Sequence, residues 1–480
     1  MQLIINNLGP IKQGEIDLSK NFYVFVGYNN SGKTYMSHLF WALFNENTIG
    51  QFAKSVKVTH FEGDSGTFEI SQSLLDNLLT QWASFLATNI IPETFNVPKT
   101  HGLFNKGFSL AFECRLEEIR SHQRQSVAHI ATQNTAGFIT LSKPKGSLTV
   151  NVTENRLLAN FANHSPIDEE PKSISAALVE FILSLVLKKT HSAFFLPSSR
   201  LVYLAFYQYF YRLEKEKKQE MSKRFIELLE MKEKGEPVEL DSLSINAFKG
   251  FYTAPMEWLF EKVYRLNEPT SVNSHYEHLT KELATMLGGD IVTKSSLGIA
   301  PIEFYLSMSH KQSEELEMYL SSSSVNQLST LYLYFKYWAK KDHNFLLIDE
   351  PEENLHPRHQ IALLNVRFDF ANDNNNRVLI TTHSPLLADM VNNYHYLALL
   401  KSKLVPINPL VKNYPEMNLD IKLTIENMGI YFFDGSQIQP YQMGNYGVFF
   451  EDFYAEIKKT KDISELLTDQ IYELINQEGS

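Results

Sequence analysis

The chain contains a single cysteine, Cys114, among its 480 residues, so no disulfide can form within it. Small secreted folds that depend on disulfides are thereby excluded, and we expect a reducing, cytoplasmic setting. An excess of basic residues is also lacking, because the formal net charge is −11. Any contact with nucleic acid would therefore need a local or assembled basic surface.

Long hydrophobic runs are absent as well. The best candidate for a membrane span, residues 174–187, is too short and contains Glu180, so it predicts a core helix and no membrane contact. The N-terminal stretch MQLIINNLGPIK has neither the charged region nor the long apolar region of a signal peptide. A hydrophobic content of 44% predicts a globular protein with a large core and more than one domain.

The strongest positive signal is a glycine-rich loop near the N-terminus. Residues 22–34, FYVFVGYNNSGKT, carry the pattern G-x-x-x-x-G-K-T between an apolar strand and a helix-forming segment, which favours a phosphate-binding loop over a plain glycine-rich turn. The backbone N–H groups would surround an anion, Lys33 would reach the β- and γ-phosphates of ATP, and Thr34 would bind Mg²⁺. The expected cofactor-binding residues of this loop are Gly27, Asn29, Asn30, Ser31, Gly32, Lys33 and Thr34.

A cluster of acidic residues follows a second apolar strand, far along the chain. Residues 345–348, FLLI, predict a central parallel strand, and Asp349 and Glu350 follow at its carboxyl end, where open α/β sheets bind ligands. One interpretation is a solvated acidic turn before a helix. The other is a metal site, in which Asp349 binds Mg²⁺ and Glu350 orients the attacking water. Because the chain also has a phosphate loop, we favour the metal site.

The two motifs lie at opposite ends of the chain and predict a split α/β head with an antiparallel β lobe, interrupted by a mainly helical insertion. The head is expected to combine three segments: residues 1–45, 130–200 and 285–400. Residues 46–129 and 201–284 would form the helical insertion or arm. Residues 401–480 would form a C-terminal extension with helices and a β-hairpin at Asp434-Gly435.

These motifs resemble those of ABC-type ATPases of the RecF/SMC/OLD class. GYNNSGKT matches the Walker A loop, FLLIDEPEENLHP matches Walker B with its catalytic glutamate, and ITTHSP matches the switch histidine. Within this class the chain resembles the compact AAA_15-type ATPase subunits of bacterial anti-phage defence systems such as PARIS and Septu. The resemblance implies an ABC-type head that uses ATP and Mg²⁺, with Glu350 and His383 as catalytic residues. The resemblance covers the two ends of the chain well and covers the central insertion, roughly residues 46–283, only loosely.

One segment departs from the family pattern. The signature before Walker B has glycine and serine at a helix start, whereas this chain has SSSSVNQLST, with Ser324 in place of a glycine. Ser323 and Ser324 could still bind the γ-phosphate of an opposite subunit, because serine hydroxyls and free N–H groups at a helix start bind anions. That interpretation implies a homo-oligomer built from head-to-head dimers. The alternative is a serine-rich helix cap.

The roles of three further residues each have two possible interpretations. Asn354 and His356 belong either to the loop after Walker B or to the cap of the next helix, and Arg200 either contacts nucleotide or anchors the insertion. The HYEH stretch at residues 275–278 predicts a solvated helix face, since adjacent helical positions point in different directions.

A second catalytic centre is not recognised. OLD-type relatives carry a nuclease module after the switch histidine, but residues 386–480 have no Asp-x-Asp pair, and Glu62-Gly63-Asp64 predicts a hairpin turn. The favoured hypothesis is therefore an ATP-hydrolysing switch or scaffold subunit of a defence complex, which controls a separately encoded nuclease. The alternative is a RecF-like ATPase that clamps DNA, and direct nucleic-acid contact stays open. A transporter motor and a hidden nuclease are weaker alternatives.

Overall fold

The computed structural model describes most of the chain. The residues outside the description are 57–65, 105, 132–135, 155–171, 189–191, 199, 268–270, 295–301, 309–313, 374, 408, 410, 412–417, 421–426, 442, 445–446 and 479–480, together with all but a few of residues 201–251. The turn expected at Glu62-Gly63-Asp64 and most of the charged part of the expected arm lie outside the described residues.

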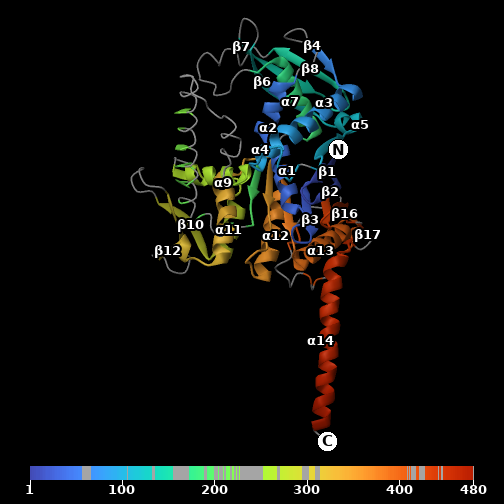
Figure 1. Ribbon diagram of the computed structural model, residues 1–480, viewed down its shortest axis with the longest axis vertical. Helices are drawn as coiled ribbons and strands as arrows, with labels where there is room; N and C mark the ends of the chain where they lie inside the picture. The colour runs from blue at the N-terminus through green and yellow to red at the C-terminus, as the bar shows by residue number, and fades with distance from the viewer. Residues whose placement is uncertain are drawn as a thin grey trace.

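The centre of the protein is a nine-stranded mixed sheet in the order β5-β1-β2-β16-β15-β3-β14-β13-β9 (Figure 1). Its strands are β1 (Gln2–Leu8), β2 (Ile11–Asp17), β3 (Phe22–Gly27), β5 (Ser109–Glu113), β9 (Ser192–Leu196), β13 (Asn344–Ile348), β14 (Arg377–Thr382), β15 (Met428–Phe433) and β16 (Gln437–Pro440). The five neighbours β15, β3, β14, β13 and β9 run parallel. Every residue of β3, β13 and β14 is buried, as their continuous apolar runs predict.

Helices cover both faces of this sheet. Side chains of β3 alternate between two cores: Tyr23 and Phe25 belong to one, and Phe22, Val24 and Val26 belong to the other. The first core includes α1 (Lys33–Phe44), α2 (Glu46–Ser55), α3 (Gln72–Phe85) and α7 (Ile174–Val186). The second includes α9 (Ala254–Tyr264), α10 (Glu277–Leu287), α11 (Ser323–Leu333), α12 (Pro357–Asn372) and α13 (Pro385–Ser402).

The motif-bearing strands meet because of their pairing. β14 lies between β3 and β13 and is parallel to both, so the carboxyl ends of all three strands open at one edge of the sheet. This edge therefore carries the loop after β3, the acidic residues after β13 and the histidine after β14.

Smaller elements surround the head. An antiparallel lobe consists of β4 (Gly66–Glu69), β6 (Arg124–Ala131), β7 (Ala136–Lys143) and β8 (Thr149–Glu154), and a three-stranded sheet consists of β10 (Gly289–Lys294), β11 (Glu303–Met308) and β12 (Glu315–Glu317). Short elements are η1 (Leu86–Ile90), α4 (Ile91–Thr94), α5 (Leu116–Arg120), η5 (Arg265–Asn267), η6 (Met318–Leu320), η7 (Tyr334–Trp338), β17 (Met443–Gly444) and β18 (Gly447–Val448). The predicted fold class, a split α/β head with an antiparallel lobe and an insertion rich in helix, is confirmed.

Two segments expected outside the head supply strands of its central sheet. β5 comes from the expected insertion and pairs with β1, while β15 comes from the expected C-terminal extension and pairs with β3. The Asp434-Gly435 hairpin forms, because the Asp434 carboxylate accepts hydrogen bonds from the N–H groups of Ser436 and Gln437, both at 2.6 Å. Pairing between such distant segments leaves no local sequence signal. The division into independently folding units stays a prediction.

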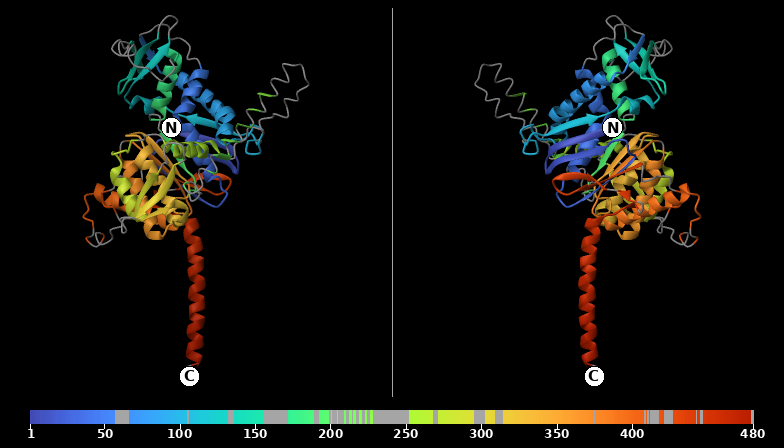
Figure 2. Two further views of the ribbon diagram at one scale, coloured as in Figure 1. Left: turned by 90° about the vertical axis from the view of Figure 1, so that its left-hand side faces the viewer. Right: turned by 90° about the vertical axis from the view of Figure 1, so that its right-hand side faces the viewer.

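The chain ends in α14 (Glu451–Glu478), a helix of 28 residues that projects away from the body (Figures 1 and 2). At 1.5 Å per residue it is about 42 Å long. Figure 1 places it at the opposite end of the molecule from the antiparallel lobe. None of the described helices combines the length and hydropathy that a membrane span requires. The predicted core helix at residues 174–187 is confirmed by α7, which is buried along most of its length.

Candidate nucleotide-binding site

The loop between β3 and α1 depends on two glycines. A Cβ atom on Gly27 would lie 2.2 Å from the carbonyl oxygen of Phe433 in the neighbouring β15, so no larger residue fits. Gly32 precedes α1 with φ of 100°, a left-handed conformation that favours glycine. Asn29 and Asn30 are exposed between them, and Asn30 has φ of 59°, which asparagine tolerates.

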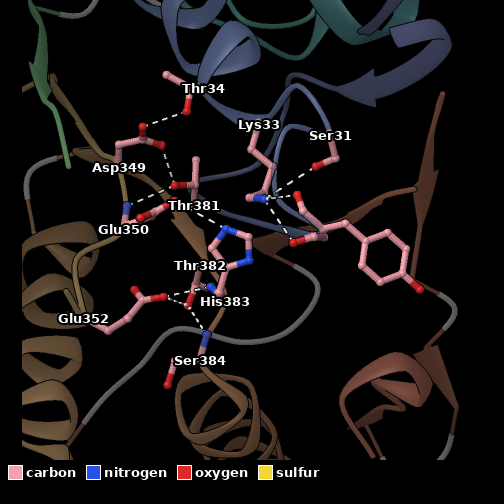
Figure 3. Close-up of polar contacts among 12 residues, drawn as sticks. Ser31, Lys33, Thr34, Asp349, Glu350, Glu352, Thr381, Thr382, His383 and Ser384 are labelled. Carbon is pink, nitrogen blue, oxygen red and sulfur yellow. Dashed lines mark hydrogen bonds and ion pairs between the residues drawn. The ribbon is translucent and has the colours of Figure 1, made fainter. Parts of the chain in front are cut away.

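The Lys33 side chain is buried against this loop. Its ammonium group donates hydrogen bonds to the carbonyl oxygens of Gly27 and Tyr28, at 3.0 and 2.7 Å, and to Ser31 Oγ at 3.4 Å (Figure 3). Burial lowers the pKa of Lys33 to about 8, against the opposing effect of nearby carboxylates such as Glu350. Lys33 is therefore still mainly charged at neutral pH, and a bound phosphate would stabilise that charge.

Asp349 joins the phosphate loop to the acidic strand. The hydroxyl of Thr34 donates to Asp349 Oδ2 at 2.8 Å, and the hydroxyl of Thr381 donates to Asp349 Oδ1 at 2.5 Å (Figure 3). Asp349 is only 3% exposed, and burial raises its pKa, although both hydroxyls act in the opposite direction. A cation beside the carboxylate would favour its charged form.

The Thr34 hydroxyl and the Asp349 carboxylate are oxygen ligands of the kind that Mg²⁺ prefers. Within the described residues no group of three or more His, Cys, Asp or Glu side chains could hold a metal. The pair of Thr34 and Asp349 suits Mg²⁺, because protein sites usually hold this ion with one or two carboxylates and leave the other positions to phosphate and water. The residues present therefore fit the expected ion.

Glu350 follows in a strained backbone conformation, with φ of 44°. Its N–H donates to the Thr381 hydroxyl at 3.0 Å, and its Oε1 lies 3.3 Å from Nε2 of His383 (Figure 3). The hydrogen bond with His383 lowers the pKa of Glu350, against the opposing effect of burial. Glu350 is thus a carboxylate at neutral pH and can accept a proton from water.

Two residues of this site were missed by the sequence reasoning. Thr381 connects Asp349 to the backbone of Glu350, and Glu352 Oε1 accepts hydrogen bonds from the N–H of His383 and the hydroxyl of Thr382, both at 2.7 Å. The only signal was position, because TTHSP directly follows a buried strand and Glu352 belongs to the acidic cluster. Together they hold the end of β14 beside that of β13.

Arg200 anchors the backbone of the acidic strand. It is 2% exposed and donates to the carbonyl oxygens of Pro197 and Asp349, both at 2.7 Å, of Glu350 at 3.3 Å and of Gln327 at 3.4 Å. These bonds occupy its guanidinium with backbone acceptors, which favours an anchoring role over nucleotide contact, but the segments that Arg200 holds among the described residues belong to the head and not to the expected insertion. The same bonds tie α11 to the turn after β13.

The predicted serines lie elsewhere. Ser323 and Ser324 are the first residues of α11, where Ser322 caps the helix by accepting a hydrogen bond from the N–H of Val325 at 3.4 Å. Within the described residues, the hydrogen-bonded cluster of Thr34, Asp349, Glu350 and His383 does not extend to Ser323 or Ser324. Ser324 Oγ instead lies 2.9 Å from Ser322 Oγ. The cap is formed by their neighbour, and their role towards nucleotide stays a prediction.

Asn354 and His356 follow the acidic residues in sequence and lie outside the hydrogen-bonded cluster of Thr34, Asp349, Glu350 and His383. His356 caps α12, since its Nδ1 accepts from the N–H of Arg358 at 3.3 Å. Asn354 is exposed in the preceding turn with φ of 57°. For His356 the structure thus favours capping.

The fold and the site define a nucleotide-binding protein of the phosphate-loop class. Residues 1–388 match the family model AAA_15, described as AAA ATPase domain. This match covers well over half of the chain, so the chain belongs to that family of ATPases. A search of curated proteins found no match.

Solved structures of SMC heads are similar to this chain at low sequence identity. The SMC head domain from Thermotoga maritima is 8% identical, with 92% of this chain and 98% of that chain covered and a TM-score of 0.29. The Smc head domain with an extended coiled coil bound to the C-terminal domain of ScpA, from Pyrococcus furiosus, is 11% identical, with 96% and 98% covered and a TM-score of 0.31. The SmcHead bound to the C-winged helix domain of ScpA is 10% identical, with 92% and 97% covered and a TM-score of 0.34. These scores are too low to support an argument about function.

The geometry predicts that Thr381→Val lowers the rate of ATP hydrolysis by about tenfold or more. The substitution keeps the shape but removes a hydrogen bond to a buried carboxylate, which costs about 1.5–3 kcal/mol, and leaves the Glu350 N–H without its acceptor. Steady-state ATPase assays with a thermal melt of each variant would measure this. The matched control is Thr330→Val, because the buried Thr330 hydroxyl has no hydrogen-bond partner in the described part of the chain. Equal rates in the two variants would contradict the role of Thr381.

Proposed function

We propose that this chain binds and hydrolyses ATP with Mg²⁺ and acts as a switch subunit that controls a separate effector, in a bacterial anti-phage defence complex. The observation that carries the proposal is the cluster of Thr34, Asp349, Thr381, Glu350 and His383 at the carboxyl ends of three adjacent strands. Membership of the AAA ATPase domain family supports its nucleotide chemistry.

Each residue of the cluster has a separable task. Lys33 and the backbone of its loop hold the β- and γ-phosphates, and Thr34 with Asp349 would hold Mg²⁺, which neutralises phosphate charge. Glu350 orients the attacking water and takes its proton. His383, held by Glu352 through its own N–H, is placed to contact the γ-phosphate and to sense its loss.

We expect Lys33→Ala to abolish nucleotide binding, because it removes the positive charge on the β- and γ-phosphates. Glu350→Gln should bind ATP as the wild type does and lose turnover, since an amide cannot accept the proton of water. Nucleotide titration and phosphate-release assays separate the two effects. Glu261→Gln is the charge-matched control, because Glu261 pairs with Arg265 on an exposed helix surface. Wild-type turnover in Glu350→Gln would remove Glu350 from the mechanism.

We further propose that two heads meet across nucleotide. The start of α11 is suited to this contact, because Ser323 is exposed and lies close in sequence to Tyr319 and Leu320, which are 61% and 59% exposed. Exposed apolar side chains beside an anion-binding helix start are typical of an interaction surface. Each phosphate loop would then face the serines of the other subunit.

The double substitution Ser323→Arg with Ser324→Arg should leave ATP binding intact and lower hydrolysis at least tenfold, because two bulky cations would block the facing site. The measurements are nucleotide affinity, ATPase rate and ATP-dependent dimerisation by light scattering. Ser73→Arg with Ser84→Arg makes the same change on exposed positions of α3 and should have no effect. Normal hydrolysis in the α11 variant would show that the head-to-head arrangement is wrong.

The helix α14 is the proposed docking element for the effector. Ile463, Leu466 and Leu467 are 58%, 68% and 54% exposed and share one helix face. Most of the stability of a helix in a protein comes from packing of its apolar face, so a partner that covers this face would stabilise α14. The helix has eight acidic and three basic residues, which disfavours pairing with a second copy and favours a basic partner.

We expect Leu466→Asp with Leu467→Asp to lower the amount of co-purifying effector at least tenfold without changing ATPase activity, because charges would disrupt the apolar contact. Ser464→Asp, on the same exposed part of α14, is the control. Affinity purification from the native cell with mass spectrometry identifies the partner, and Glu350→Gln should alter its amount. The isolated chain should hydrolyse ATP without cutting nucleic acid.

Two outcomes would replace this proposal. Metal-dependent cleavage of DNA or RNA by the purified chain alone would favour a nuclease within the chain. Tight, steeply salt-dependent binding of duplex DNA without a protein partner would favour the RecF-like alternative.

A further inference from the structure

A cavity lies at the opposite edge of the central sheet from the nucleotide site. It has a volume of about 420 Å³ and is lined by residues at the amino ends of the motif-bearing strands: Asn21 before β3, His343 before β13 and Arg377 at the start of β14. The remaining wall comes from the end of α7, the segment that enters β6, Lys145 in the turn between β7 and β8, and Asn375 before β14. Since the motif-bearing strands have five or six residues, the cavity is about 16–20 Å from the nucleotide site.

The lining of this cavity is strongly basic. The lining residues include no aspartate or glutamate. Six of them are basic: His122, Arg124, Lys145, Lys188, His343 and Arg377. Asp342 lies beside the lining, with its Oδ1 3.1 Å from His343 Nδ1, and can compensate that residue only. Two other nearby carboxylates are engaged elsewhere. Glu118 pairs with the N-terminal ammonium group, and Asp17 lies 3.6 Å from Lys20 and accepts from the N–H of Ser19 at 2.9 Å.

Capping of α7 explains only part of this charge. Arg377 donates to the carbonyl oxygen of Leu187, the C-cap residue of that helix, at 3.1 Å, and to Leu18 O at 3.2 Å, so its charge has a structural task. Cations near a helix C-terminus are stabilised by its dipole. The same account does not extend to Arg124 and Lys145, whose side chains make no hydrogen bond to that helix end in the described structure.

Two polar atoms in the wall are buried and have no hydrogen-bond partner among the residues that the structure describes: Arg124 Nε and His122 Nδ1. Such an atom costs about 1–3 kcal/mol when left unpaired. Burial lowers the pKa of Arg124 to about 10, so it keeps its charge at neutral pH, and burial with Lys188 and Lys143 lowers the pKa of His122. A ligand with several anionic oxygens would offset the repulsion among the cations that line the cavity.

We propose that this pocket binds the phosphoryl group of a small phosphorylated molecule, as a site separate from the one that holds ATP. An arginine fork with flanking lysines is the side-chain set that binds phosphate in proteins. The volume falls within the range of about 300–1,000 Å³ that is typical of small-molecule pockets, so a nucleotide-sized ligand can enter. A ligand here would contact the starts of the same strands whose far ends carry Lys33, Asp349 and His383.

The test uses the full-length Lys33→Ala variant, which removes the first phosphate site. Isothermal titration with pyrophosphate should show one saturable site, and Arg124→Gln with Lys188→Gln should weaken its affinity at least tenfold. Arg265→Gln with Lys281→Gln makes the same change at exposed cations that pair with carboxylates, and it should leave the affinity unchanged. Separate titrations with inorganic phosphate and with adenosine monophosphate distinguish a free anion from a nucleotide.

The Arg124 and Lys188 substitutions are also placed in a chain that keeps Lys33. Retained ATP binding and an unchanged melting temperature there show that a lost pyrophosphate site is not caused by unfolding. The proposal is overturned if no probe saturates below about 1 mM, or if the control pair weakens binding as much as the pocket pair. Tighter binding of a short oligonucleotide, lost with the same pocket pair, would assign the surface to nucleic acid instead.

Discussion

The parallel pairing of β14 with β3 on one side and β13 on the other is the constraint on which the site depends. Alone, the loop after β3 is an anion-binding turn, and the acidic segment after β13 is a cluster of repelling carboxylates. The strand pairing brings the Thr34 hydroxyl oxygen to 2.8 Å from Asp349 Oδ2, although the two residues are 315 positions apart in the sequence. All three strands are buried between two cores, which protects this pairing from solvent.

Electrostatic compensation is incomplete on both edges of the sheet. At the carboxyl edge, Lys33 and the carboxylates Asp349 and Glu350 are gathered in a buried or half-buried space, where burial opposes the charged forms of Lys33 and Asp349. At the amino edge, a basic cavity has two buried polar atoms without partners among the described residues. Ligands of opposite chemistry, a metal–phosphate complex and an anion, would relieve the two imbalances. Both proposals thus rest on the same principle, that buried charge needs a partner.

Much of the fold could be predicted from the sequence because its signals are local. Continuous apolar runs marked the buried strands β3 and β13, the G-x-x-x-x-G-K-T pattern marked the loop before α1, and Asp434-Gly435 marked a hairpin. The sheet order could not be predicted. β15 lies beside β3 since Gly27 lets its backbone approach Phe433 O, a contact that no spacing in the sequence reveals.

The sequence by itself determined which residues to expect at the site: the motifs at the strand ends marked Lys33, Thr34, Asp349 and Glu350, and the family resemblance added His383. Only the tertiary structure decided what holds them. The hydroxyl of Thr381, the carboxylate of Glu352 and the guanidinium of Arg200 act through contacts with segments remote in sequence. A threonine, glutamate or arginine is common in any chain, so its role exists only where folding places its polar atoms against particular partners.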